Sequence, residues 1–168
     1  MFGLLLDFFI VSNQQALKVE VTTPVPHRVK FVQIVTRDPD LPHPDLQDST
    51  GTPLTLPYLD PPLGGYKFQE ADAEVFYWDY HETCQTSYCK TSHLQDDKAT
   101  FYDRPALVGS GAFEFALFVV EDKQDTLCPL AQVNWTVQNH IVQEAKRVSD
   151  VDLPLLRRFV TNQDLSCS

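Results

Sequence analysis

AFEFALFVV, at residues 112–120, and LAQVNWTV, at residues 130–137, are the two stretches that decide the fold of this 168-residue chain. The first is the most apolar run in the sequence, follows a Gly-Ser-Gly break, and predicts a strand. The second alternates apolar and polar residues, which is typical of a half-buried strand. Residues 121–129 between them are polar and predict a loop, so we expect the two strands to pair antiparallel.

Further strands are predicted on both sides of this pair. Residues 17–21 (LKVEV) alternate apolar with polar residues, whereas residues 29–36 (VKFVQIVT) are β-branched and apolar on both faces, as in a central strand. Residues 74–80 (EVFYWDY) resume the β pattern. The chain therefore reads as one mainly β domain over residues 1–168, an antiparallel β-sandwich or barrel.

The C-terminal region, residues 139–163, is predicted to be helical. Ile141, Val142, Ala145 and Val148 fall at helical spacing, although three of them are β-branched, which also permits a strand. The signal is stronger over residues 152–160, where an Asp can cap the N-terminus and a Pro falls in the first turn. We expect this helix to cover one face of the sheet.

Residues 37–65 form a different kind of segment, because they contain seven of the twelve prolines. Proline fixes φ and removes a backbone donor, so this stretch predicts an extended loop rather than a strand or helix. Long loops of this kind are usually functional. Its apolar side chains can anchor it to its own sheet or to a partner, and the candidate interface residues there are Leu41, Leu46, Leu54 and Tyr58.

The N-terminal run MFGLLLDFFIV does not have the pattern of a cleavable signal peptide, because no basic residue precedes it and Asp7 interrupts it. It is also shorter than the roughly 20 residues that span a bilayer. We expect a strand or short helix of the domain, or else an apolar arm that binds a partner through Phe2, Leu4, Leu6 and Phe8. The chain is then cytoplasmic at synthesis or part of an assembled particle.

The formal net charge of −10 argues against two classes of partner. Such a surface repels nucleic-acid phosphates and anionic lipid surfaces unless a basic patch overrides the net field. The densest basic pairs, Lys146–Arg147 and Arg157–Arg158, are spread over an Asp-rich C-terminal segment. We therefore expect neither nucleic-acid binding nor membrane insertion.

One segment has the ligands for a metal. His81, Cys84, Cys89 and His93 lie within thirteen residues, and two thiolates with two imidazoles are a set that zinc prefers. The order of these ligands matches no standard zinc finger. A disulfide between Cys84 and Cys89 explains the same residues, as do free thiols. No other cofactor is indicated.

Candidates for catalysis are few. Asp79, His81 and Glu82 form an acid–base group after a predicted strand, and Asp103 is a further candidate that the fold could bring near them. Phosphate-binding loops and dinucleotide motifs are missing from the sequence.

The residues Asn134, Trp135 and Thr136 satisfy the N-glycosylation sequon. They lie on a predicted strand in a chain with no recognisable signal peptide. We therefore expect Asn134 to remain unmodified.

Three functional interpretations follow. The apolar N-terminal run, the proline-rich loop and the lack of a catalytic motif favour a non-enzymatic structural or interaction protein. It would bind protein partners or itself, as a subunit of a larger assembly of the virion, tail or appendage type. The alternatives are a small zinc-stabilised binding module and a hydrolase that uses the Asp/His/Glu group.

Overall fold

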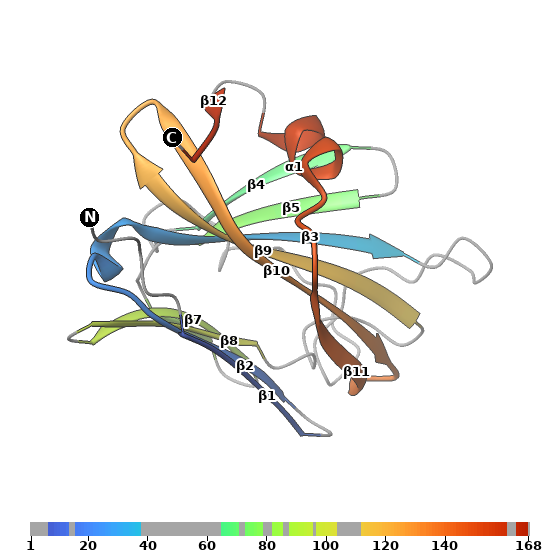
Figure 1. Ribbon diagram of the computed structural model, residues 1–168. Helices are drawn as coiled ribbons and strands as arrows, with labels where there is room; N and C mark the ends of the chain where they lie inside the picture. Colours follow the sequence, from blue (N-terminus) through green and yellow to red (C-terminus); the bar gives the residue numbers. More distant parts are fainter. Residues whose placement is uncertain are drawn as a thin grey trace.

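The computed structural model describes nine parts of the chain. These are residues 7–13, 16–37, 65–70, 73–78, 82–85, 88–95, 97–103, 112–160 and 164–167. Two antiparallel sheets face each other across a shared core (Figure 1). The prediction of a mainly β, antiparallel architecture with a C-terminal helix is confirmed.

The five-stranded sheet runs in the order β1, β2, β8, β7, β6. Every neighbouring pair in it is antiparallel. The bounds of its strands, in chain order, are β1 (Asp7–Asn13), β2 (Ala16–Thr22), β6 (Glu82–Gln85), β7 (Tyr88–Gln95) and β8 (Lys98–Asp103).

The seven-stranded sheet runs in the order β11, β10, β9, β3, β5, β4. A short parallel strand, β12, pairs with one end of β10. Its strands are β3 (Val29–Arg37), β4 (Gly65–Glu70), β5 (Ala73–Trp78), β9 (Ala112–Lys123), β10 (Thr126–Gln138), β11 (Ile141–Val148) and β12 (Asp164–Leu165). Two short helices complete the described elements, η1 (Pro26–Arg28) and α1 (Leu153–Phe159).

The inner faces of the two sheets form the main core. Alternate residues of each strand point inward, as a period of two requires. Phe31 of β3 meets Phe101 of β8 across the interface with ring centroids 5.5 Å apart, and Phe115 stacks on Trp135 within the seven-stranded sheet at 3.9 Å. Central strand β3 and half-buried strand β2 lie where the sequence predicts them.

A second, smaller core lies on the outer face of the seven-stranded sheet, beneath α1. Leu156 and Phe159 of α1 are buried against Val32, Phe118 and Leu127 of the sheet. The helix begins as the sequence predicts, because Oδ1 of Asp152 accepts a hydrogen bond from the backbone N–H of Leu155 at 3.1 Å.

Two expectations for the C-terminal half are wrong. The predicted loop over residues 121–129 is mostly strand, because β9 continues to Lys123 and β10 begins at Thr126. The reversal takes only Gln124 and Asp125, and Gln124 adopts the positive φ of 63° that so tight a turn needs. Hairpin geometry, rather than polarity, sets the length of this connection.

Residues 141–148 are strand β11 and not helix, so the helical region predicted over residues 139–163 shrinks to α1. Asn139 and His140 both have positive φ, which is the two-residue hairpin turn that leads into a paired strand. A register shift opposite Thr136 and Val137 inserts one extra residue into β11. Because of this bulge, Val142 and Ala145 both pack on the main core although they are three residues apart. Apolar residues three apart are also typical of a helix, which explains the wrong prediction.

One polar contact crosses the main core. The side-chain amide of Gln33 in β3 donates a 3.0 Å hydrogen bond to Oδ2 of Asp103 in β8, and both residues are fully buried. Such a bond is strong in a low-dielectric interior, and breaking it is costly because a polar group is left buried. Gln33 and Asp103 thus fix how the two sheets sit on each other.

Replacing Asp103 with Ala should lower the free energy of unfolding by about 2–3 kcal/mol, because the buried Gln33 amide loses its acceptor. Urea unfolding followed by circular dichroism measures the change. The matched control, Asp97→Ala, removes an exposed carboxylate just before the same strand and should stay within about 0.5 kcal/mol of wild type. Equal stabilities of the two variants would contradict a structural role for the Gln33–Asp103 bond.

Candidate binding groove on the outer face of the seven-stranded sheet

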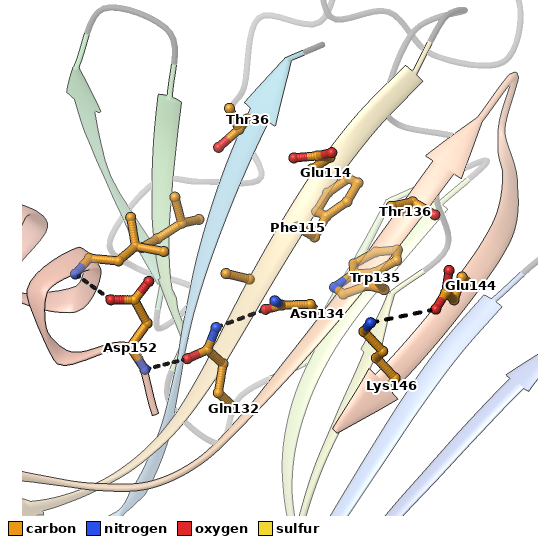
Figure 2. A pocket seen from close by; sticks show the side chains of 13 residues that line it. Thr36, Glu114, Phe115, Gln132, Asn134, Trp135, Thr136, Glu144, Lys146 and Asp152 are labelled. Atoms are coloured by element: carbon orange, nitrogen blue, oxygen red, sulfur yellow. Dashed lines mark hydrogen bonds and ion pairs between the residues drawn. The ribbon is translucent and has the colours of Figure 1, made fainter. Parts of the chain in front are cut away.

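The cavity that stands out among the described residues is a groove on the outer face of the seven-stranded sheet. It has a volume of about 330 Å³ and lies between the N-terminal end of α1 and strand β11 (Figure 2). Strands β3, β9 and β10 form its floor. Its lining residues are Ile34, Thr36, Glu114, Phe115, Ala116, Gln132, Asn134, Trp135, Thr136, Glu144, Lys146, Asp152 and Leu155.

The alternation of β10 explains why this floor is polar. Val133 and Trp135 point into the main core and are buried, so Gln132, Asn134 and Thr136 point to the opposite face. The sequence predicts this split between the two sides of the strand. The sequence does not predict that α1 is too short to cover the polar side chains at this end of β10.

Gln132 is the centre of the hydrogen bonding in the groove, although only 2% of it is exposed. Its Oε1 accepts a 2.8 Å hydrogen bond from the backbone N–H of Asp152, and its Nε2 donates a 2.8 Å bond to Oδ1 of Asn134 (Figure 2). The Gln132 amide therefore accepts a hydrogen bond from the backbone at the N-terminus of α1 and also orients the Asn134 side chain. The groove wall is held in place by this link between sheet and helix.

The charges of the groove lie toward β11. Lys146 Nζ is 3.9 Å from Glu144 Oε1, with both side chains about two-thirds exposed at 69% and 65%. A pair this exposed contributes little to stability. Glu114 and Asp152 add two more carboxylates, so the lining offers amide, hydroxyl and carboxylate groups and one cation. Among the described lining residues there is neither His nor Cys.

Among the described residues, a carboxyl group with a lowered pKa lies outside the groove, on the outer face of the five-stranded sheet. This group is Glu20, which pairs with Lys18. A hydrogen bond from Lys18, whose Nζ is 2.7 Å from Glu20 Oε1, lowers the pKa of Glu20, and Lys98 adds a weaker attraction. Partial burial acts in the opposite direction. Because the folded-state pKa is lowered, this contribution to stability is present above the unfolded pKa of Glu and is lost as the pH falls through the folded value.

Of the proposed catalytic residues, the structure describes Asp103 and the backbone of Glu82, and neither lines the groove. Asp103 is fully buried beside Gln33, inside the sandwich. Glu82 is the first residue of β6, at the edge of the five-stranded sheet, and Asp79 and His81 lie outside the described residues. The hydrolase interpretation gains no support from Asp103, since a buried carboxylate has no access to a substrate.

Three of the four candidate metal ligands, Cys84, Cys89 and His93, lie on the paired strands β6 and β7. The register of these strands bears on the choice between zinc and a disulfide. Cys84 lies directly opposite Cys89, one pair away from the closing pair Gln85 and Tyr88. In a hairpin with a two-residue connection this is a non-hydrogen-bonded position, with Cα atoms about 4.5 Å apart, which is within the range that disulfides span.

His93 lies farther along the same strand. It is four residues beyond Cys89 in β7, which is about 13 Å of extended chain, whereas ligands must all lie within about 2.3 Å of a zinc ion. The backbone register therefore favours the disulfide interpretation of these cysteines. His81 lies outside the described residues, and no cluster of three or more metal-binding side chains occurs among the side chains that are described.

The other two cysteines form a disulfide. Cys128 of β10 is bonded to Cys167, with Cα atoms 4.6 Å apart and a sequence separation of 39. The backbone N–H of Ser166 also donates to the carbonyl of Leu127 at 3.0 Å. Together these contacts fasten the C-terminal segment to one end of the long β9–β10 hairpin.

The candidate interface residues of the sequence fall mainly outside the described parts of the chain. This holds for Phe2, Leu4 and Leu6 and for the whole set in the proline-rich segment, that is Leu41, Leu46, Leu54 and Tyr58. Phe8 lies in β1, opposite Val21. Among the described residues, no helix is long and apolar enough to cross a membrane.

The fold and the groove define a class of protein, a two-sheet antiparallel β-sandwich with a short helix packed on the outer face of one sheet. No family model matches the chain, and neither the curated proteins nor the solved structures contain a match to it. Its function must therefore be argued from its own residues.

Cysteine mapping of unreduced protein should find Cys84 linked to Cys89 and Cys128 linked to Cys167. We expect no reactive thiols after denaturation, and no stoichiometric zinc in elemental analysis of the same sample, because the hairpin register pairs the first two cysteines with each other. The variant Cys84→Ser/Cys89→Ser is the control for assigning the peptide. Two free thiols accompanied by one zinc per chain would instead support the zinc module.

Proposed function

We propose that this chain is a non-enzymatic interaction protein that serves as a subunit of a larger protein assembly. The observation that carries the proposal is that the edge strands of the two sheets lie next to each other on one side of the sandwich. Strand β1 ends the five-stranded sheet and β11 ends the seven-stranded sheet, and the two strands contact each other. Neither has a second hydrogen-bonded neighbour among the described strands.

Strand edges are a recognised means of association. An edge presents a row of backbone donors and acceptors, and a strand from another chain can add to it. Soluble proteins commonly protect such edges with charged residues or proline. The sequence of β1, DFFIVSN, has one charge at its first residue and no proline. This edge is therefore suited to receive a partner strand.

Exposed apolar side chains on the same two strands also support an interface on this side of the molecule. Among the described residues, the large hydrophobic side chains that remain exposed are Phe9, at 51%, and Ile141, at 42%. Phe9 belongs to β1 and Ile141 begins β11, so both lie on the edge strands. Burying them against a partner would remove apolar surface from water at about 25 cal/mol per Å².

The groove supports a binding role more than a catalytic one. Its described lining residues offer hydrogen-bonding amides and hydroxyls beside an exposed ion pair, and none of its carboxylates has a His or Cys partner within the lining. A polar groove of this kind can bind a ligand or accommodate a partner without any reaction.

Light scattering coupled to size exclusion tests the assembly proposal. At physiological salt, where the net charge of −10 is screened, the wild-type chain should form a defined oligomer. Phe9→Lys and Ile141→Lys should shift it toward monomer, because each places a charge on an edge and removes an apolar contact. The matched control Gln124→Lys adds the same charge at the exposed turn between β9 and β10, away from Phe9 and Ile141, and should leave the oligomer intact.

Folding of each variant must be checked by urea unfolding. The exposed edge substitutions should change the free energy of unfolding of the monomer by less than about 1 kcal/mol. A wild-type chain that stays monomeric at every concentration would contradict self-association. Loss of the oligomer in the Gln124→Lys control would show that net charge, rather than the β1 and β11 edges, governs the association.

A further inference from the structure

Asn134 and Thr136 lie two residues apart on β10 and line the same groove. Both are partly exposed, whereas Trp135 between them points into the main core and is 1% exposed. The two side chains that define the sequon Asn134, Trp135, Thr136 therefore open onto one cavity of about 330 Å³. The Asn134 amide, which a glycan would modify, lies between Gln132 and Lys146 among the side chains that line this space (Figure 2).

The orientation of the Asn134 amide also fits modification. Its Oδ1 accepts the 2.8 Å hydrogen bond from Nε2 of Gln132, and this contact sets which end of the amide is the oxygen. An N-linked sugar is attached to Nδ2, and the amide oxygen keeps its acceptor role afterwards. The hydrogen bond to Gln132 is thus compatible with a glycan and would hold the modified side chain in a fixed orientation.

The disulfide supplies the second, independent observation. Cys128 and Cys167 are bonded across 39 residues, and the register of β6 and β7 places Cys84 opposite Cys89. Disulfides of this kind form and persist in oxidising compartments and are rare where glutathione keeps thiols reduced. In eukaryotic cells N-glycosylation takes place in such a compartment. The disulfide therefore weakens one of the two reasons for which the sequence favours an unmodified Asn134, the lack of a recognisable signal peptide, and leaves its position on a strand to be explained.

We propose that Asn134 is an N-glycosylation site whose first sugar lies in the groove on the outer face of the seven-stranded sheet. The donor is an oligosaccharide linked to a lipid pyrophosphate. Nδ2 of Asn134 forms a bond to C1 of the first sugar while one of its N–H bonds and the C1–oxygen bond of the donor break. The lipid pyrophosphate leaves, and the proton passes to a base of the transferase.

The position of Asn134 fixes the order of events. Strand β10 is hydrogen-bonded on both sides, with Asn134 opposite Ala116 of β9 and Lys146 of β11. A transferase could not reach this backbone after the sheet has formed, so transfer precedes folding of the seven-stranded sheet. The open groove then leaves room for the sugar, with the side chains of Thr136, Glu144 and Lys146 available to contact its hydroxyls.

Expression of the full chain behind a cleavable signal peptide in a eukaryotic secretory host tests this proposal. The secreted wild-type protein should carry one glycan, which peptide N-glycanase removes while converting Asn134 to Asp. Intact-mass and peptide mass spectrometry should show the glycan lost in Asn134→Gln and in Thr136→Ala. Thr136→Ser should keep it, because the hydroxyl of the sequon is preserved.

A matched control comes from the neighbouring hairpin turn. In the Asn134→Gln background, Ile141→Thr creates a sequon at the exposed Asn139, and this variant should regain one glycan. An unmodified wild-type chain beside a modified control would overturn the proposal, since Asn134 would then be inaccessible to the transferase. A glycosylated wild-type chain that is less stable to urea than the Asn134→Gln variant would also overturn it, because the groove would then not accommodate the glycan in the native fold.

This proposal does not depend on the assembly proposal. Its readout is the mass of the secreted chain, whereas assembly is read from the oligomeric state. The two can fail separately.

Discussion

Burial of β9 on both faces is the constraint on which the rest of this structure depends. On one side Phe115, Leu117 and Val119 point into the main core, and on the other Phe118 and Val120 point away from it. A strand this apolar is stable only when both of its faces are covered. The five-stranded sheet covers the first face and α1 covers the second. The fold is accordingly three layers deep at β9.

The five-stranded sheet and α1 cover unequal lengths of β9 and β10, and the groove lies where α1 does not reach. The five-stranded sheet spans the inner face, whereas α1 has seven residues and is only about 10 Å long. It covers Phe118 and Val120 but does not extend to the end of β9 and β10 where Glu114 and Thr136 lie. The outer face there is polar because no apolar element protects it. Gln132 marks the boundary, since it is buried and bonded to the first turn of α1 on one side and to Asn134 on the other.

The sequence predicts those features that arise from local pattern. Alternation places Val133 and Trp135 inward and Asn134 outward, and Asp152 caps α1 as expected. The residue pattern gives the wrong secondary structure where pairing with a neighbouring strand decides the backbone conformation. The bulge in β11 puts Val142 and Ala145 on the core at a spacing of three, which no single-chain periodicity separates from a helix. The groove itself depends on how far α1 reaches along the sheet, and residue pattern holds no information on that distance.

The proposed glycan and the proposed assembly edge lie close together and constrain each other. Asn134 is paired with Lys146 of β11, so a glycan in the groove would stand one strand away from the edge of the seven-stranded sheet. It would cover the outer face beside that edge and block a partner that approaches face-on. A partner strand that adds in the plane of the sheet makes its bonds to the backbone of β11, at right angles to the glycan. If both proposals hold, association must therefore occur edge to edge, and the glycan would act to exclude face-to-face stacking of the seven-stranded sheets.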